Sequence, residues 1–250
     1  MSARARQVLE QADTVVGYGT YLDLLGPLIA GKEIIRTGMT KEVQRVAAAI
    51  TAARADRRVA LVSGGDPGIY AMAGLALEMC AARQMRVVAN GAVAVQPDDP
   101  QKSVSIEVVP GIPALCAGAA LLGAPLAHDF AVISLSDLLT PWEVIQRRID
   151  AAAQADFVIV IYNPKSKRRD WQLQRARDRI LRHRNGGTPV GIVTGAMRET
   201  QRIRLTTLYH LDRDPIDMQT IVFIGNSATV RYGDFIYTLR GYGRKYEFDH

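Results

Sequence analysis

Residues 58–68, RVALVSGGDPG, join an apolar run to a glycine-rich turn, and a helical pattern resumes near Ala71. The apolar run from Arg58 to Val62 is typical of a buried strand. Further β-rich runs alternate with helical patterns along the chain, which predicts an α/β protein. The expected strands are residues 15–18, 58–62, 104–109, 131–135, 157–162, 190–194, 202–208 and 220–224.

Two expected helices begin with capping signals. Thr40 precedes apolar residues at helical spacing, and Thr140-Pro141-Trp142-Glu143 has the pattern of a capping box with proline at the first helical position. A helix of small residues is expected over 113–122, and an exposed loop or hairpin over 90–103. We place the domain boundary after the small-residue helix, which gives domains 1–126 and 127–250. The later strands of the second domain could pair antiparallel.

The composition is that of a globular protein, with 250 residues of which 48% are hydrophobic and 22% charged. The chain opens without the apolar run of a secretory signal, and prolines interrupt the longest uncharged stretch. We therefore expect no membrane span. The two cysteines lack a neighbouring ligand pattern, which indicates a reducing cytoplasm and no metal site.

The positive charge is concentrated in one segment. The net charge is +6, and residues 165–184 alone hold nine Lys or Arg against two Asp. This run fits a nucleic-acid surface, a solvated helix face or a site for a small polyanion. The solvated face fits best the end of the run. The candidates for binding an anionic substrate lie at its start and are Lys165, Lys167, Arg168 and Arg169.

Two glycine turns could bind a ligand. Gly64-Gly65-Asp66-Pro67 follows a strand, where open α/β sheets bind ligands, and glycine allows close backbone approach. Asp66 before Pro67 is also a good helix N-cap, so a purely structural turn explains the pattern equally well. Val109-Pro110-Gly111 precedes the small-residue helix, whose free N–H groups would suit an anion. The chain has neither GxGxxG nor GxxxxGK[ST], which argues against nicotinamide and nucleoside triphosphate cofactors.

These two turns resemble motifs of the class III tetrapyrrole methylases, and the resemblance covers residues 7–237. The family usually opens with a strand and a Gly-x-Gly-Pro-Gly loop, whereas this sequence begins at what resembles the following helix. Four blocks narrow the resemblance to the members that methylate C-17 of precorrin-3B. They are His128-Asp129-Phe130, Ile133-Ser134-Leu135-Ser136-Asp137, Pro141-Trp142-Glu143 and Tyr162-Asn163-Pro164.

The resemblance implies two α/β domains, with a mostly parallel sheet in the first, a mixed sheet in the second, and a cleft between them for S-adenosylmethionine. It implies a homodimer that methylates precorrin-3B at C-17 and contracts the ring to precorrin-4 in cobalamin biosynthesis, with S-adenosylhomocysteine as product. The residues it implies for the cofactor are Gly64, Gly65, Asp66, Ile69, Pro113, Ala114, Tyr162, Asn163, Ala196, Met197, Thr206 and Thr207.

Methyl transfer from a sulfonium mainly requires orientation, because the leaving group is already good. Ring contraction also needs proton movement, and the candidate groups are His128, Asp129, Ser136 and Asp137. A loop histidine or a turn-capping aspartate is often only structural. The basic residues at the start of the 165–184 run would bind the carboxylates of the tetrapyrrole.

Three alternatives stay open. A methylase of the same superfamily that acts on the cobalt-containing C-17 substrate, or on C-11 of precorrin-4, would keep the fold and the methyl donor. A basic RNA-binding protein or RNA methylase would need aromatic residues within the basic run, which holds only Trp171. The third alternative is an inactive interaction subunit.

Overall fold

The computed structural model describes residues 1–89, 103–166, 169–213 and 215–248. The chain forms two compact units, Met1–Pro113 and Ala114–His250. This division lies before the small-residue helix, whereas the sequence predicted it after that helix. The reason is packing, because the backbone of Gly118 in this helix lies against the side chains of Phe223 and Ile221 in the second unit. The loop or hairpin expected over residues 90–103 lies almost wholly outside the described residues.

The strand pairs described in the first unit are parallel, in agreement with the predicted mostly parallel sheet. One sheet has the order β2-β1-β3 and a second pairs β4 with β5. The strands are β1 (Thr14–Tyr18), β2 (Glu33–Thr37), β3 (Val59–Val62), β4 (Arg86–Ala89) and β5 (Ser103–Ile106). The helices are α1 (Ala3–Gln11), α2 (Gly19–Leu25), the 3₁₀ turn Gly26–Ile29, α3 (Glu42–Arg54) and α4 (Met72–Ala82).

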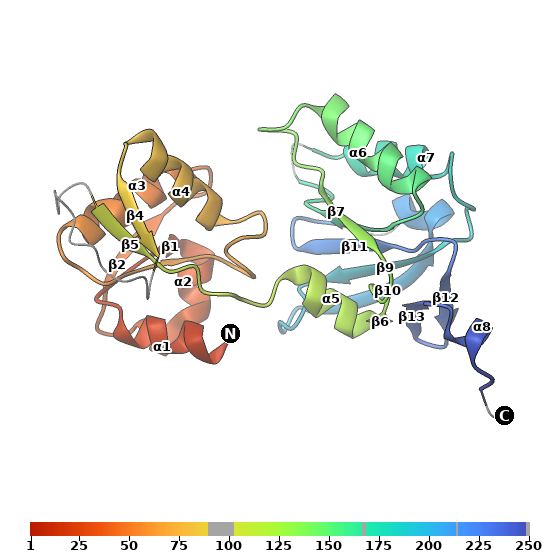
Figure 1. Ribbon diagram of the computed structural model, residues 1–250, viewed down its shortest axis with the longest axis horizontal. Helices are drawn as coiled ribbons and strands as arrows, with labels where there is room; N and C mark the ends of the chain where they lie inside the picture. Colours follow the sequence, from red (N-terminus) through yellow and green to blue (C-terminus); the bar gives the residue numbers. More distant parts are fainter. Residues whose placement is uncertain (90–102, 167–168, 214, 249–250) are drawn as a thin grey trace. The chain divides into compact units, whose positions relative to one another are not determined.

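The first unit has two small cores. Leu9 of α1 and Leu22 of α2 pack with Val15 and Ala60 of the sheet. Val46 and Ile50 of α3 and Cys80 of α4 instead form a cluster with Val104 of β5. Figure 1 shows the pair α1 and α2 on one side of the strands and the pair α3 and α4 on the other. Because β1, β2 and β3 are parallel, their carboxyl ends lie along one edge of the sheet.

The second unit is built on a mixed five-stranded sheet with the order β10-β9-β11-β8-β7, again as predicted. β7 and β8 are parallel, whereas β11 runs antiparallel to both β8 and β9. The strands are β7 (Phe130–Ser134), β8 (Val158–Tyr162), β9 (Pro189–Thr194), β10 (Arg202–Thr207) and β11 (Thr220–Ile224). A small sheet joins β6 (Gly123–Ala124), β12 (Thr229–Tyr232) and β13 (Phe235–Thr238).

Helices cover both faces of the large sheet (Figure 1). Ile145 and Ile149 of α6 pack with Leu173 and Ile180 of α7 in the main core, and α5 packs on the other face through Gly118. The helices are α5 (Ala114–Leu122), α6 (Trp142–Gln154), α7 (Gln172–Ile180), the 3₁₀ turn Leu208–Arg213 and α8 (Tyr242–Lys245). In the described part of the chain no helix is long and apolar enough to cross a membrane.

Both predicted helix caps are wrong. α3 begins after Lys41, and Thr40 has a positive φ of 62° with its hydroxyl donating to the carbonyl of Met39. α6 begins after Pro141 without a capping hydrogen bond from a side chain, so Thr140 forms no capping box. In both cases the chain makes one more turn residue before the helix than the pattern predicts.

Candidate functional site

The two glycine turns of the first unit are joined by the carboxylate of Asp66. One oxygen, Oδ1, accepts a hydrogen bond from the backbone N–H of Gly68 at 2.8 Å. The other, Oδ2, accepts from the N–H of Gly111 at 3.0 Å, across 45 residues of sequence. The alternative in which Asp66 caps a helix is wrong, because α4 begins only at Met72, but both carboxylate oxygens do have a structural role in the turns. We call the joined turns, residues 63–68 and 109–111, the glycine corner.

Two glycines of the corner lie in close contact with neighbouring atoms, which in the case of Gly111 belong to the backbone. A Cβ atom on Gly111 would lie 2.0 Å from the carbonyl oxygen of Gly65, and one on Gly64 would lie 2.8 Å from the ring of Tyr21. Gly65 itself has a φ of 75°, which other residues rarely adopt. The backbone of Gly65 is exposed, while Ile69 beside it is half-buried. The corner thus presents main-chain atoms to a ligand without side chains in the way.

In the second unit, the predicted residues Tyr162 and Asn163 end β8. The Tyr162 hydroxyl accepts from the N–H of Leu115 at 2.9 Å, in the first turn of α5, directly after Ala114. Asn163 has a φ of 50° and donates from Nδ2 to the hydroxyl of Ser134 at 2.9 Å. Ser134 ends β7 and pairs with Tyr162, so these contacts lie at the carboxyl ends of two parallel strands.

Asp137 and Arg169 meet near the same strand ends. Asp137 accepts from the amide of Gln172 at 2.8 Å, and Arg169 donates to the carbonyl of Asn163 at 3.0 Å. Burial lowers the pKa of the Arg169 guanidinium, and the negative charge of Asp137 opposes that effect. The Nε–H of Arg169 is buried without a hydrogen-bond partner among the described residues. Arg169 therefore keeps donor capacity for an anion at this edge.

The structure separates the predicted second-unit residues onto opposite edges of the sheet. Strand pairing places the carboxyl ends of β7, β8 and β9 on one edge and their amino ends on the other. The first edge, which we call the carboxyl edge, holds Ser136, Asp137, Tyr162, Asn163, Ala196 and Met197. The opposite edge holds His128, Asp129, Thr206 and Thr207.

This separation divides the four candidates for proton transfer. Asp129 immediately precedes β7 and its carbonyl accepts from Val158, whereas Ser136 and Asp137 follow the strand. A five-residue strand spans roughly 16 Å, so the two pairs cannot act on one atom. His128 instead accepts a hydrogen bond at Nδ1 from the N–H of Asp129.

For the remaining predicted residues the structure gives little more than their exposure to solvent. Pro113 is the half-buried last residue of the first unit, Lys165 is exposed, and Met197 is 64% exposed. Lys167 and Arg168 lie outside the described residues. Within the described ranges no cluster of three or more His, Cys, Asp or Glu could hold a metal ion.

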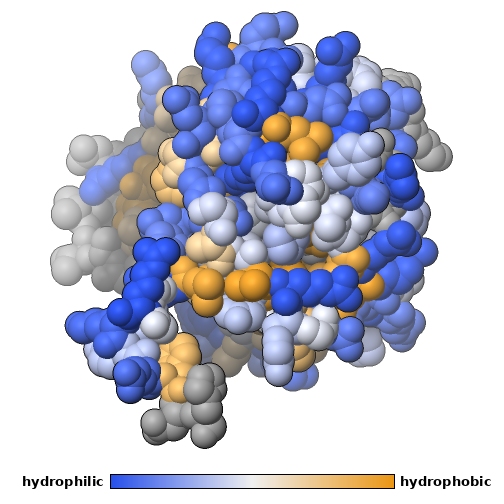
Figure 2. All heavy atoms as spheres, turned by 90° about the vertical axis from the view of Figure 1, so that its right-hand side faces the viewer, coloured by the Kyte–Doolittle hydropathy of each residue, from blue (hydrophilic) through white to orange (hydrophobic). Residues whose placement is uncertain are grey.

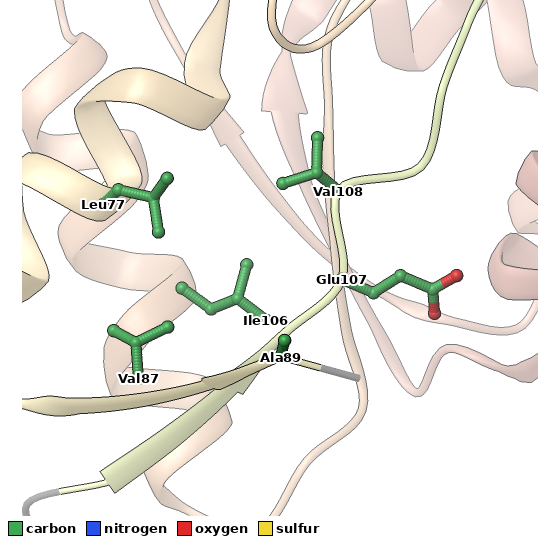
Figure 3. Close-up of a pocket in the computed structure, with 6 residues that line it drawn as sticks. All are labelled: Leu77, Val87, Ala89, Ile106, Glu107 and Val108. Atoms are coloured by element: carbon green, nitrogen blue, oxygen red, sulfur yellow. The ribbon is translucent and has the colours of Figure 1, made fainter. Parts of the chain in front are cut away.

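A hollow of about 480 Å³ lies in the first unit and extends to Val108, the residue directly before the second turn of the glycine corner. It is lined by side chains of α4, β4 and the end of β5, and its lining is mainly apolar. Figure 3 shows Glu107 pointing away from the apolar side chains, and its carboxylate pairs with Arg4. The hollow contains none of the predicted site residues. The lining residues are Leu77, Val87, Ala89, Ile106, Glu107 and Val108.

Two residues of these sites escaped the sequence reasoning. Gln172 is 3% exposed and holds Asp137, and Tyr21 packs on Gly64. Gln172 had a detectable signal, since it is a polar residue beside the apolar Leu173 at the start of a helix. Tyr21 had none, because only the fold brings it to the corner.

The chain matches known proteins over most of its length. The family model of the tetrapyrrole (corrin/porphyrin) methylases matches residues 1–97 and 98–212. Cobalt-factor III methyltransferase of Priestia megaterium is 44% identical over 98% of this chain, but the chain spans only 43% of that protein. A probable cobalt-factor III C(17)-methyltransferase of Salmonella typhimurium is 44% identical over 97% of this chain and 93% of its own length. Precorrin-3B C(17)-methyltransferase of a Sinorhizobium species is 39% identical over 97% and 91%.

Solved structures of methyltransferases have the same fold as this chain. The methyltransferase CobJ superposes with a TM-score of 0.82 at 32% identity, over 96% of this chain and 93% of its own. Uroporphyrin-III C-methyl transferase from Thermus thermophilus, complexed with S-adenyl homocysteine, gives 0.63 at 20% identity over 90% of both chains, a likeness of fold alone. The matched family model, the similar relatives and the shared fold together show that the chain belongs to the tetrapyrrole (corrin/porphyrin) methylase family.

Proposed function

We propose that this chain transfers a methyl group from S-adenosylmethionine to C-17 of precorrin-3B and takes part in the contraction of the ring to precorrin-4. The joined glycine turns, Asp66 bonded to Gly111, carry the proposal, because they present an open backbone at strand ends. The printed names of the relatives support the reaction class. The cobalt-containing substrate is the second candidate, favoured by the relatives at 44% identity.

The methyl donor fits the glycine corner. Gly65 has no side chain, is exposed and has a positive φ, so a ligand can approach its backbone closely. In the proposal Gly64, Gly65, Asp66, Ile69 and Pro113 of the first unit hold the donor. When bound, the donor supplies an electrophilic methyl group on a positively charged sulfur.

For the second unit, the shared carboxyl edge supports a joint role of the predicted residues in the same function. Ala114, Tyr162, Asn163, Ala196 and Met197 are the donor-binding residues that the proposal keeps. Tyr162 and Asn163 are fixed by their hydrogen bonds to Leu115 and Ser134. Thr206 and Thr207 lie at the opposite edge, which leaves them without support from this geometry.

The carboxyl edge also suits an acidic macrocycle. Arg169 keeps an unpartnered buried N–H, and arginine binds carboxylates through such donors. Leu138 and Leu139, next to Asp137, are 82% and 93% exposed, which gives an apolar surface beside the charge. We therefore assign carboxylate binding to Lys165 and Arg169, and to Lys167 and Arg168 from sequence alone. For proton movement, the placement of Asp137 and Ser136 favours them over His128 and Asp129.

The alternative of a nucleic-acid surface loses support from the basic helix. Arg177 pairs with Asp178, Arg179 pairs with Asp150, and Arg184 is buried. Much of the positive charge on α7 and in the segment after it is therefore neutralised or enclosed. The free thiols of Cys80 and Cys116 fit our proposal of a cytoplasmic protein.

We also propose that the protein is a homodimer. Val230 and Tyr232 of β12 pair with Tyr237 and Phe235 of β13, and all four side chains are more than a third exposed. Figure 2 faces the side on which β12, β13 and α8 lie, and it shows an apolar band crossing a mainly hydrophilic surface. Sedimentation of the wild-type protein and of a Phe235→Asp variant tests the proposal, since only the variant should be monomeric.

The experiment for the enzymatic function uses two acceptors. The purified protein is incubated with S-[methyl-¹³C]adenosylmethionine and either precorrin-3B or cobalt-factor III, and the products are analysed by mass spectrometry and absorption. We expect incorporation of one labelled methyl group and the spectrum of a contracted ring. No label in either acceptor, with wild-type protein that is folded, contradicts the proposal. Label in cobalt-factor III alone selects the second candidate.

A further inference from the structure

The first unit buries a guanidinium that no acidic residue of the described ranges neutralises. Arg45 lies in the first turn and a half of α3 and is only 5% exposed. Nε donates to the hydroxyl of Thr37 at 2.7 Å and Nη2 to the carbonyl of Gly38 at 2.9 Å. Among the described residues no Asp or Glu forms an ion pair with it. A buried charge without an opposite charge is costly, so its retention calls for an explanation.

The position in the helix adds to the cost. The amino end of a helix carries a partial positive charge, which disfavours a cation and favours an anion. Glu42 is the acidic residue of the first turn, but within the described structure it makes no hydrogen bond or ion pair with Arg45. Both the burial and the helix dipole would be compensated by a negatively charged ligand.

The guanidinium also keeps donor capacity. Of its five N–H groups, two are used by Thr37 and Gly38, and a third points to Sδ of Met72 at 3.6 Å, a weak acceptor. Gly38 is exposed, and Thr37, Met72 and Tyr18 are half-buried, so Arg45 lies one layer below the surface. A carboxylate that replaced the thioether contact would meet a planar fork of donors.

Contacts link Arg45 to the glycine corner. Its guanidinium lies over the ring of Tyr18, 5.8 Å from the centroid, and Tyr18 packs edge-to-face on Tyr21. The ring of Tyr21 in turn lies against Gly64. β1 ends at Tyr18 and β2 at Thr37, and both strands run parallel to β3, which leads into the corner. The buried cation therefore lies on the same sheet edge as the proposed donor site.

We propose that Arg45 is a carboxylate-binding residue that anchors a carboxylate of a bound substrate at this edge. The inference rests on the proposed function, which supplies two sources for that group. One is the amino-acid carboxylate of S-adenosylmethionine and the other is an acetate or propionate side chain of the tetrapyrrole. In this proposal the ligand carboxylate supplies the negative charge that Arg45 lacks among the described residues.

Titration calorimetry with two probes distinguishes the donor source. S-adenosylhomocysteine carries the amino-acid carboxylate, and 5′-methylthioadenosine lacks it. If Arg45 holds this group, Arg45→Gln weakens S-adenosylhomocysteine binding about tenfold or more and leaves 5′-methylthioadenosine unchanged. If it holds the acceptor, both probes bind as in wild type and the KM for the tetrapyrrole rises by a similar factor. Arg54→Gln, an exposed position of the same helix, is the matched control.

Arg45→Lys separates ligand binding from folding, because it keeps the charge and loses the planar fork. We expect a folded protein with weakened binding of the same ligand. Two results overturn the inference: wild-type affinity and KM in both variants, or unfolding of both variants, which would make Arg45 a purely structural residue. Wild-type protein that binds neither S-adenosylhomocysteine nor a tetrapyrrole contradicts the proposed function itself, and this inference falls with it.

Discussion

The carbonyl oxygen of Gly65 occupies the space that a side chain on Gly111 would need, 2.0 Å from the position of its Cβ. Both partners in this contact belong to the backbone, so neither can rotate away. The contact and the bond from Gly111 to Asp66 hold the two turns together.

Gly111→Ala is therefore expected to separate the turns. The variant should lose about 2 kcal/mol or more of unfolding free energy, because the two turns must move apart to make room for the alanine Cβ. For the same reason it should bind S-adenosylhomocysteine weakly. Thermal unfolding and calorimetry measure both effects. Gly74→Ala, in α4 where nothing lies within 4 Å of the new Cβ, is the control and should be as stable as wild type or slightly more so. If the two variants had the same stability and the same affinity for S-adenosylhomocysteine, the two turns would not be held together by this contact.

Tyr162→Phe removes the hydroxyl that accepts from Leu115 and leaves an amide of α5 without that partner. The expected loss is about 1 kcal/mol, or roughly 2–4 °C in Tm, with donor affinity nearly unchanged because the ring remains. Tyr162→Ala should reduce stability and S-adenosylhomocysteine affinity together. A Phe variant as stable as wild type would mean that the hydroxyl bond contributes nothing.

Arg184→Met tests a buried cation with a purely structural role. Arg184 donates to the carbonyls of Gly225 and Phe157 and has a side chain only 2% exposed. Burial lowers the pKa of its guanidinium, which Asp156 partly offsets. Loss of this donor should cost at least about 3 kcal/mol, measured by urea unfolding, since buried carbonyls are left unpaired. Arg182→Met, at an exposed neighbouring position, should cost far less.

Asp137→Asn and His128→Gln compare the two edges of the large sheet. We expect Asp137→Asn to slow ring contraction about a hundredfold or more while methyl transfer persists, and His128→Gln to leave both steps near wild type. Separate mass and absorption readouts follow the two steps. Contraction lost in the His128 variant and intact in the Asp137 variant would reverse the assignment.

Asp150→Asn should alter the acid side of the stability profile. Hydrogen bonding to Arg179 holds the pKa of the Asp150 carboxyl below its usual value. A lowered native pKa contributes stability above the unfolded pKa of about 3.9 and loses it as the pH falls through the native value. The variant should thus unfold at a lower temperature than wild type at pH 7, with the gap closing below about pH 4. Asp178→Asn is the control, because it makes the same change of charge on the outer side of α7. If the difference in unfolding temperature between wild type and Asp150→Asn did not depend on pH, the pairing with Arg179 would be excluded as its cause.

Much of the fold was predictable, and the reasons are local. Apolar runs predict buried strands such as Val158–Tyr162, and the glycine turns predict where strands end. The capping predictions at Thr40 and Thr140 failed because the same residues also suit the turn before a helix.

The arrangement of the site was less accessible. The expected strand over residues 131–135 already separates His128 from Asp137. Strand direction in a mixed sheet does not follow from composition, so the sequence did not show that Thr206 and Thr207 lie at the edge opposite Met197. Arg45 had a visible signal, a charged residue beside Val46 on the apolar face of a helix, which is unusual enough to mark a site or a buried network. The contact of Tyr21 with Gly64 depends on the fold alone.

The contact between the two turns of the glycine corner is made by main-chain atoms, which substitutions do not replace. Any replacement of Gly111 meets the same carbonyl, whatever its chemistry, so divergence cannot readily retune this corner. If the corner holds the donor as proposed, the preference of this protein for one macrocycle over another rests on side chains elsewhere, such as those around Asp137 and Arg169.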